Sequence, residues 1–248
     1  AFNGFRRRWI ITPSPGGVSA AVEDDYHCMD VAFEHDGVTI TSVRAEMDRW
    51  PWSTCPGAAD AIRQTFTGAQ LAAAAKRREK TANCTHLFDL ALLAARHALD
   101  AMPTRYDAMI GDPAQGVVEA ELLRDDVSLL HWTLANDEVI APSDLAGTNL
   151  FALKGWIASQ SAPIQEAARL LQWATLIAQG REIPMERQSD ATRMPPNCFT
   201  FQPDRAKIAV REGRIYDFSD ATAEPLSHFD GGHFRSAPAG RKPIWPPA

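Results

Sequence analysis

A strict alternation of apolar and polar residues between residues 27 and 49 is the feature that most constrains the fold. Met29, Val31 and Phe33 alternate with small or polar residues, and the same period resumes beyond a short break. Alternation at every second residue is typical of a strand with one buried face. The dipeptide Asp36-Gly37 in the break is a strong signal for a tight turn. This stretch therefore predicts an antiparallel β-hairpin.

The rest of the chain mixes further strands with helices. The spacing of apolar residues predicts helices over residues 70–80, 83–101, 149–159 and 164–179, and two more strands over 117–123 and 127–134. Strands and helices do not alternate with a regular βαβ beat. We therefore expect an α+β fold, with a mainly antiparallel sheet or partial barrel and packed helices. The alternative is an all-helical core with peripheral hairpins.

The length and the lack of linkers indicate a single domain over residues 1–248. This length lies within the range of one domain, and no repeat or low-complexity segment divides it. From about residue 225 the sequence is rich in Pro, Gly and His, so we expect an irregular tail whose histidines, His228 and His233, are exposed. The run Arg6-Arg7-Arg8 is interpreted as a solvated stretch.

The overall charge limits the partners that the chain can have. The formal net charge is −6, whereas nucleic acids and anionic membranes favour a basic face, so neither is expected as a partner. The sequence shows no stretch typical of a signal peptide or a membrane span. Its four cysteines include no C-x-x-C pair and form no dense framework of the kind that disulfides make. We therefore expect them to be reduced thiols. We expect a cytoplasmic protein, with a homodimer as the commonest assembly if it self-associates.

Sequence motifs for common cofactors are missing. There is no glycine-rich nucleotide loop, no H-E-x-x-H and no G-x-S-x-G, so no cofactor is expected. Cys55, Cys84, His27, His86 and Asp89 would make a metal site only if the fold gathered them, because they lack the compact paired spacing of zinc sites. We therefore expect no metal and interpret both cysteines as small buried side chains. A metal-dependent hydrolase remains an alternative.

One face of the second hairpin strand carries ionisable side chains and leads into aromatic ones. Arg44 and Glu46 lie two residues apart on that face, and Trp50 and Trp52 follow. A curled sheet would turn this face into a cleft with aromatic walls, which is the character of a small-molecule site. A flat sheet would leave the same residues as a charged exterior. His131, in the second group of strands, is open to the same two interpretations.

Two histidines are candidates for a general base. His27 follows an acidic run whose carboxylates would raise its pKa, but it is equally compatible with an edge-strand position. His86 and Asp89 lie three residues apart and therefore share one face of a helix, which can hold a histidine in a single tautomer. The alternative for this second pair is a helix-capping cluster in which Asp89 is solvated.

Four short islands of sequence stand out from the rest. They are DDYH at 24–27, PWSTCPGA at 51–58, CTHLFDL at 84–90 and NCFTFQPDRA at 197–206. Together they resemble a bacterial family that is known only as a domain of unknown function. Longer members of that family resemble proteins encoded among genes for the breakdown of aromatic compounds. The resemblance implies a cofactor-independent lyase that acts on a lignin-derived phenolic dimer, for example a phenylcoumaran-type phenol, and releases formaldehyde.

The lyase hypothesis gives a role to each candidate residue. Such an enzyme needs a base, an acid for the departing phenoxide and a slot for an aromatic ring. His27 or His86 would be the base, and Glu46 would be the acid. The expected substrate-binding residues are Tyr26, Arg44, Trp50, Trp52 and His131. The alternatives are the metal-dependent hydrolase and a protein that binds a small molecule without turnover.

Overall fold

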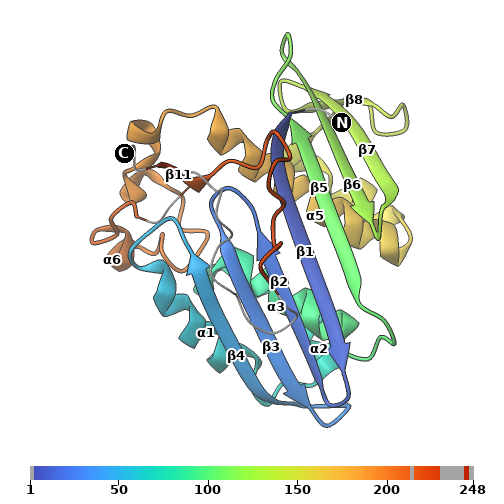
Figure 1. Ribbon diagram of the computed structural model, residues 1–248, viewed down its shortest axis with the longest axis vertical. Coiled ribbons are helices and arrows are strands. Elements are labelled where there is room, and N and C mark those ends of the chain that lie inside the picture. Colours follow the sequence, from blue (N-terminus) through green and yellow to red (C-terminus); the bar gives the residue numbers. More distant parts are fainter. Residues whose placement is uncertain (1–2, 213–214, 230–242, 246–248) are drawn as a thin grey trace.

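One large antiparallel sheet organises the molecule, as a computed structural model shows for residues 3–212, 215–229 and 243–245. The sheet has nine strands in the order β4-β3-β2-β1-β5-β6-β7-β8-β9 (Figure 1). These strands are β1 (Gly4–Ser14), β2 (Gly17–Glu23), β3 (Cys28–His35), β4 (Ile40–Arg49), β5 (Thr104–Gly111), β6 (Val117–Arg124), β7 (Val127–Ala135), β8 (Glu138–Ala141) and β9 (Thr148–Asn149). A separate pair joins β10 (Ile215–Tyr216) and β11 (Pro243–Trp245).

The hairpin predicted from the alternation is confirmed as β3 and β4. Its turn is held by Asp36, whose Oδ1 accepts hydrogen bonds from the N–H groups of Val38 and Thr39 at 2.9 and 2.7 Å. Gly37 follows with a φ of +95°, a conformation that glycine adopts at low cost. The turn residues therefore set where β4 begins.

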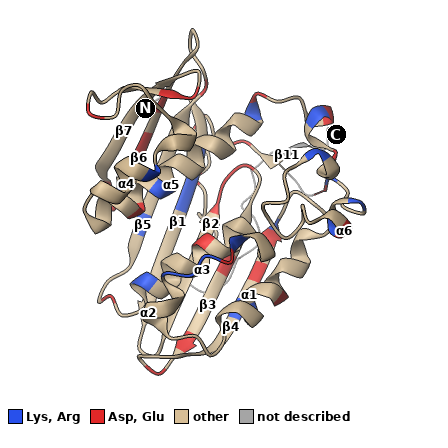
Figure 2. Cartoon of the chain, turned by 180° about the vertical axis from the view of Figure 1, so that it is seen from behind, with Lys and Arg blue, Asp and Glu red and all other residues tan. Residues whose placement is uncertain are grey.

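The helices cover one face of the sheet (Figure 2). α1 and α3 pack on the strands β2 to β4, and α5 packs on β5 to β7. The α-helices are α1 (Ala58–Phe66), α2 (Leu71–Ala74), α3 (Thr85–His97), α4 (Lys154–Ser159), α5 (Ala162–Ala178) and α6 (Pro203–Ala206). Between the layers, the ring of Phe66 lies 5.7 Å from that of Phe33 on the sheet and 5.5 Å from that of Phe88 on α3. The α+β fold is thus confirmed, and the all-helical core is wrong.

Single turns interrupt some of the expected helices. The helix predicted over residues 70–80 shortens to α2, because only Leu71 and Ala74 are buried in it and a longer helix would gain little from packing. The 3-10 turns are η1 (Cys55–Gly57), η2 (Lys80–Ala82), η3 (Leu150–Ala152), η4 (Gln179–Arg181), η5 (Met185–Gln188) and η6 (Ala191–Arg193). Across the described part of the chain, no helix is both long and apolar enough to cross a lipid bilayer.

The segment 215–229 lies against the other face of the sheet, in front of β1 and β2 in Figure 1. The Leu226 N–H donates a hydrogen bond to Glu23 Oε2 at 2.5 Å, and Glu224 pairs with Arg8 at 2.8 Å. His228 is buried rather than exposed, because this segment docks on the sheet. His233 lies outside the described residues.

Candidate functional site

The corner between β2 and β3 is built around the carboxylate of Asp24. Its Oδ1 accepts hydrogen bonds from the backbone N–H groups of Tyr26 and His27, at 2.7 and 2.8 Å. The Asp24 N–H in turn donates to the His27 carbonyl at 2.9 Å. A short acidic side chain that bonds the backbone two or three residues ahead stabilises a tight corner. The local sequence DDYH thereby fixes the position of His27.

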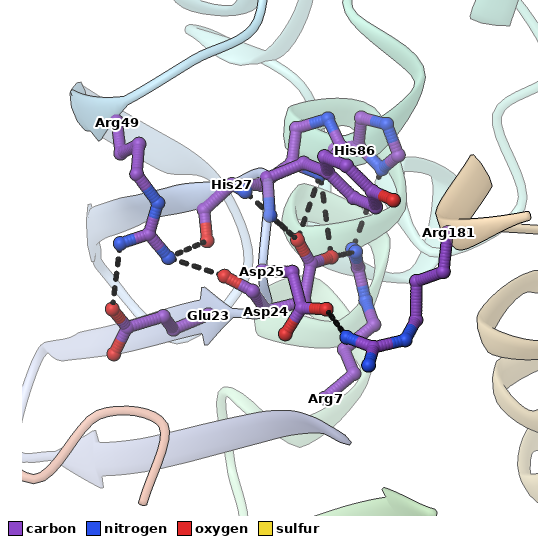
Figure 3. A network of polar contacts seen from close by, with 9 residues as sticks. Arg7, Glu23, Asp24, Asp25, His27, Arg49, His86 and Arg181 are labelled. Carbon is purple, nitrogen blue, oxygen red and sulfur yellow. Dashed lines mark hydrogen bonds and ion pairs between the residues drawn. The ribbon is translucent and has the colours of Figure 1, made fainter. Parts of the chain in front are cut away.

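Asp24 also belongs to a chain of buried polar side chains (Figure 3). It accepts a hydrogen bond from His27 Nδ1 at 3.0 Å and pairs with the guanidinium group of Arg7. Nη2 of Arg7 reaches Nδ1 of His86 at 3.3 Å. The centroids of the two imidazole rings are 3.8 Å apart. These contacts therefore join strand β1, the β2–β3 corner and the first turn of α3.

Burial and neighbouring charges set the protonation of these groups. Burial acts to raise the pKa of Asp24, but His27 and Arg7 outweigh it, and the pKa of Asp24 lies far below its usual range. Burial lowers the pKa of His27 against the opposing effect of Asp24. Burial, the ring of His27 and the charge of Arg7 lower the pKa of His86 well below its usual value. At neutral pH, Asp24 is therefore ionised and both imidazoles are neutral.

The hydrogen bonds hold the two histidines in opposite tautomers. An arginine side chain can only donate, so Nδ1 of His86 must accept from Arg7, and the ring proton of His86 is on Nε2. An ionised carboxylate can only accept, so Nδ1 of His27 must donate to Asp24, and Nε2 of His27 keeps its lone pair. Both rings line one cavity. The site therefore combines a proton acceptor and a hydrogen-bond donor on neighbouring rings.

A cavity of about 260 Å³ adjoins the two imidazole rings. Most of its lining is apolar or aromatic, and Trp52 and Phe201 meet there edge to face with ring centroids 5.9 Å apart. Trp173 and the exposed Met194 and Asn197 also line it. This volume is just below the range of about 300–1,000 Å³ that is typical of small-molecule pockets. The cavity therefore suits a compact aromatic ligand.

Wider hollows occur elsewhere on the described surface, but they lack this chemistry. One of about 410 Å³ lies beside Thr175 and Arg181, and one of about 700 Å³ lies beside His97 and Glu166. His97 uses both ring nitrogens, because Nε2 bonds to Glu166 at 2.8 Å and Nδ1 bonds to Asp100 at 2.7 Å. An imidazole with both nitrogens engaged by carboxylates offers no lone pair to a ligand.

The cysteines of the cavity are thiols rather than thiolates. Burial raises the pKa of Cys55 to about 11 and that of Cys84 to about 12. The Cys55 sulfur lies 3.3 Å from the hydroxyl oxygen of Thr200. Because the nucleophile is the thiolate, neither group is a nucleophile at neutral pH, and both pack as small buried side chains.

Two predicted site residues lie on the opposite face of the sheet. The alternation in β4 directs Ala45 and Met47 toward the helices, so Arg44 and Glu46 point the other way. Arg44 pairs there with Asp30 at 2.7 Å and with Glu46 at 3.2 Å, and the Glu46 side chain is 51% exposed. The prediction that Arg44 and Glu46 share a cavity with His27 is therefore wrong.

Of the predicted aromatic and imidazole residues, some line the cavity and others lie away from it. Tyr26 and Trp52 line the cavity, and burial raises the pKa of Tyr26. Trp50 packs against the small apolar cluster that contains Trp52 and does not line the cavity. His131 lies on β7, is 54% exposed and pairs with Glu119 of β6 at 2.7 Å. Three strands, β1, β5 and β6, separate β7 from β2 in the sheet. Of the two tryptophans, Trp52 alone lines the cavity, and His131 belongs to the charged exterior that was the alternative for it.

The partner of His86 also differs from the prediction. Asp89 pairs with Lys80 at 2.6 Å, and the contact to His86 comes from Arg7 instead. Arg7 is only 4% exposed, so the interpretation of its basic run as solvated is wrong for this residue. The signal was present in β1, because alternation puts Arg7 on the same face as Phe5 and Trp9.

Within the described residues, one group brings three metal-type ligand atoms together. It comprises Glu23, Cys28 and His228, whose ligand atoms lie within 4.8 Å of one another. Arg49 already pairs with Glu23 at 3.1 Å. Because His228 belongs to the C-terminal segment and the other two residues belong to the sheet, the group attaches that segment to the sheet. The set of cysteines and histidines considered for a metal-dependent hydrolase forms no such group in this part of the chain.

The fold and the site together define an α+β protein whose antiparallel sheet places a buried Asp–His pair beside an aromatic cavity. Residues 12–100 match the model of a family described as "Protein of unknown function (DUF2889)". The expected resemblance to a domain of unknown function is thereby confirmed over this stretch, which contains Asp24, His27 and His86 but not Arg7. No curated protein matches the chain.

Proposed function

We propose that the chain is a cofactor-independent lyase that uses acid–base chemistry on a small phenolic molecule. The supporting observation is the pair of neutral imidazoles, His27 and His86, in opposite tautomers beside an aromatic cavity. A general base needs an open lone pair and must be unprotonated at the working pH, and the lowered pKa of His27 meets the second requirement. Asp24 orients the ring and stabilises the imidazolium that forms, as carboxylates do in other Asp–His pairs.

The proposed substrate is a phenolic dimer of the phenylcoumaran type. The electron pair of its para-phenolate moves through the ring, the ether C–O bond breaks, and a quinone methide forms. His27 Nε2 then takes the proton of the γ-hydroxyl group, and the O–H electron pair becomes the second bond of formaldehyde. The carbon–carbon bond to the hydroxymethyl group breaks, and its electron pair forms the new double bond of the side chain. The exocyclic electron pair of the quinone methide returns to the ring, which becomes an aromatic phenolate again. The departing phenoxide, hydrogen-bonded by His86 Nε2–H, receives the proton that His27 collected.

The character of the cavity supports an aromatic substrate. Trp52, Trp173 and Phe201 offer flat apolar walls, and aromatic rings pack favourably against such walls in stacked or edge-to-face arrangements. The volume of about 260 Å³ matches one substituted ring, so the second ring of a dimer would lie toward Met194 and Asn197. The resemblance to proteins of aromatic breakdown agrees with this choice of substrate.

Formaldehyde release from a phenylcoumaran-type dimer tests the proposal. The wild-type protein should release one formaldehyde per substrate and form a conjugated double bond, which absorbance detects. His27→Gln should lower the rate by about 10²–10⁴-fold, the usual contribution of a general base. Glu46→Gln, on the opposite face, should leave the rate within a factor of two. No formaldehyde from any phenolic dimer, or an unchanged rate in His27→Gln, would exclude the mechanism. A rise in melting temperature with intact ligand would instead favour binding without turnover.

A further inference from the structure

Arg211 brings a positive charge to the wall of the cavity. The backbone of Arg211 forms a short β-bridge with that of Trp52, and the Ser53 N–H donates to the Val210 carbonyl at 2.9 Å beside it. The guanidinium group therefore lies over the Trp52 ring, 5.3 Å from its centroid. Arg211 lines the same cavity as the two imidazoles.

The other arginines near the site each face a carboxylate. These pairs are Arg7–Asp24, Arg49–Glu23 and Arg181–Asp25. Arg211 differs, because it forms no ion pair and no side-chain hydrogen bond with any residue of the ranges that the structure describes, and its Nε is buried without a partner. Of these four arginines, Arg211 is therefore the one whose charge no described side chain neutralises.

The two described side chains that act electrostatically on Arg211, Tyr26 and Cys55, carry no negative charge at neutral pH. Burial lowers the pKa of Arg211, and the phenol of Tyr26 and the thiol of Cys55 act in the opposite direction. Burial also raises the pKa of Tyr26 and raises that of Cys55 to about 11, so both groups stay protonated. A cation that leaves water without a partner costs several kcal/mol. An anionic ligand would remove that cost.

We propose that Arg211 binds the anionic oxygen of an aromatic ligand, either a carboxylate or a phenolate, while the ring of the ligand lies against Trp52. The planar guanidinium group matches carboxylate and phenolate oxygens through charge-assisted hydrogen bonds. The inference rests on the proposed function, because it treats the ligand of this cavity as the substrate. It gives Arg211 the place of a substrate-binding arginine, which the sequence had led us to expect of Arg44.

Two ligands of the same shape test the carboxylate. Cinnamate carries a charge and cinnamamide does not, so their affinities differ mainly through the charge. The wild-type protein should bind cinnamate roughly 10- to 100-fold more tightly in calorimetry, since a hydrogen bond to a charged group contributes about 1.5–3 kcal/mol. Equal affinities, or binding of neither ligand, would exclude a carboxylate.

A chromogenic phenol tests the phenolate. The absorbance of 4-nitrophenol reports which protonation state is bound, and the wild-type protein should bind the phenolate and lower the pKa of the bound phenol. In whichever of the two tests, carboxylate or phenolate, the wild-type protein prefers the anion, Arg211→Gln should abolish that preference. Arg211→Lys should keep part of it. If neither arm shows a preference for the anion in the wild-type protein, or if Arg211→Gln keeps it, the inference is overturned.

His27→Gln separates this inference from the proposed function. The variant should keep the preference for the anion, because Arg211 is unchanged, but should lose turnover. A variant that turns over normally removes the proposed mechanism and leaves the anion site intact. Melting curves show whether Arg211→Gln is folded, and if it is not, the wild-type ligand pairs and Arg211→Lys decide the outcome.

Discussion

Asp24 holds both the backbone and the ring of His27. Its Oδ1 lies 2.8 Å from the backbone nitrogen of His27 and 3.0 Å from Nδ1 of the same residue. A single buried carboxylate thus fixes the corner of the chain and the tautomer of the side chain that the corner carries. Structure and chemistry at this position therefore depend on the same oxygen atom.

Asp24→Asn should be strongly destabilising. The amide keeps one acceptor for the backbone, but it leaves the buried Arg7 without a counter-charge. Removing one partner of a buried ion pair costs about 3–5 kcal/mol, which urea unfolding measures. Asp89→Asn is the matched control, because its partly exposed pair with Lys80 should contribute only about 0–1 kcal/mol. Similar losses in the two variants would contradict the importance of the buried pair.

The rate of the proposed reaction should fall on the acidic side of its pH profile only below the usual pKa of histidine. Burial lowers the pKa of His27, so the base stays unprotonated to a pH lower than about 6.5, the value for a free histidine. The pH dependence of kcat/KM measures this limb. An acidic limb centred above that value would show that another group, or a histidine with a raised pKa, is the base.

The stability of the protein should depend on pH through His86. Its folded-state pKa lies well below the unfolded value, so the unfolded chain binds more protons below about pH 6.5. Stability should therefore fall on acidification, by up to about 1.4 kcal/mol per pH unit from this group. His86→Gln should be less sensitive than the wild-type protein between pH 6.5 and 5 in urea unfolding. Parallel curves for the two proteins would contradict the prediction.

His97 should show the opposite pH dependence and serves as the comparison. Burial acts to lower the pKa of His97, but Glu166 and Asp100 outweigh it and raise that pKa. The stability that His97 contributes is therefore fully present below its unfolded pKa and is lost as the pH rises through the folded one. The stability difference between wild type and His97→Gln should shrink as the pH rises. A difference that grows with pH would have the wrong sign.

The buried thiols of Cys55 and Cys84 should react slowly in the folded protein. Burial raises the pKa of Cys84 to about 12, and only the thiolate attacks alkylating reagents. Iodoacetamide at pH 8 should therefore label Cys84 only after unfolding, as mass spectrometry of the peptides can show. Cys198 is less buried and should label first. Rapid labelling of Cys84 in the native protein would contradict its burial.

The strands and the main helices follow from local patterns, whereas the site depends on contacts between distant segments. Alternation and the Asp36-Gly37 turn are enough to predict β3 and β4. The same alternation led to the wrong expectation that Arg44 and Glu46 face the cavity. A period of two shows that these residues share a face, but it does not show which face the helices cover. The sequence therefore predicted the strand correctly and the direction of its polar side chains incorrectly.

The site residues divide according to the distance that separates them along the chain. His27 and the Asp24 that holds it are three residues apart, so a local corner motif brings them together. Arg7 and Arg211 reach the site only through packing of β1 and through the bridge to Trp52. No spacing rule relates residues 7, 86 and 211, so sequence patterns alone did not group them.

The position of Arg7 has a consequence for any shortened form of the chain. The stretch that matches the family model begins at residue 12, five residues after the guanidinium group that neutralises Asp24. A fragment cut at that boundary would keep both imidazoles and the aspartate, but the aspartate would lose its counter-ion. Its carboxylate would then have to attract solvent or a proton, and the tautomer of His86 would no longer be dictated by a neighbouring donor.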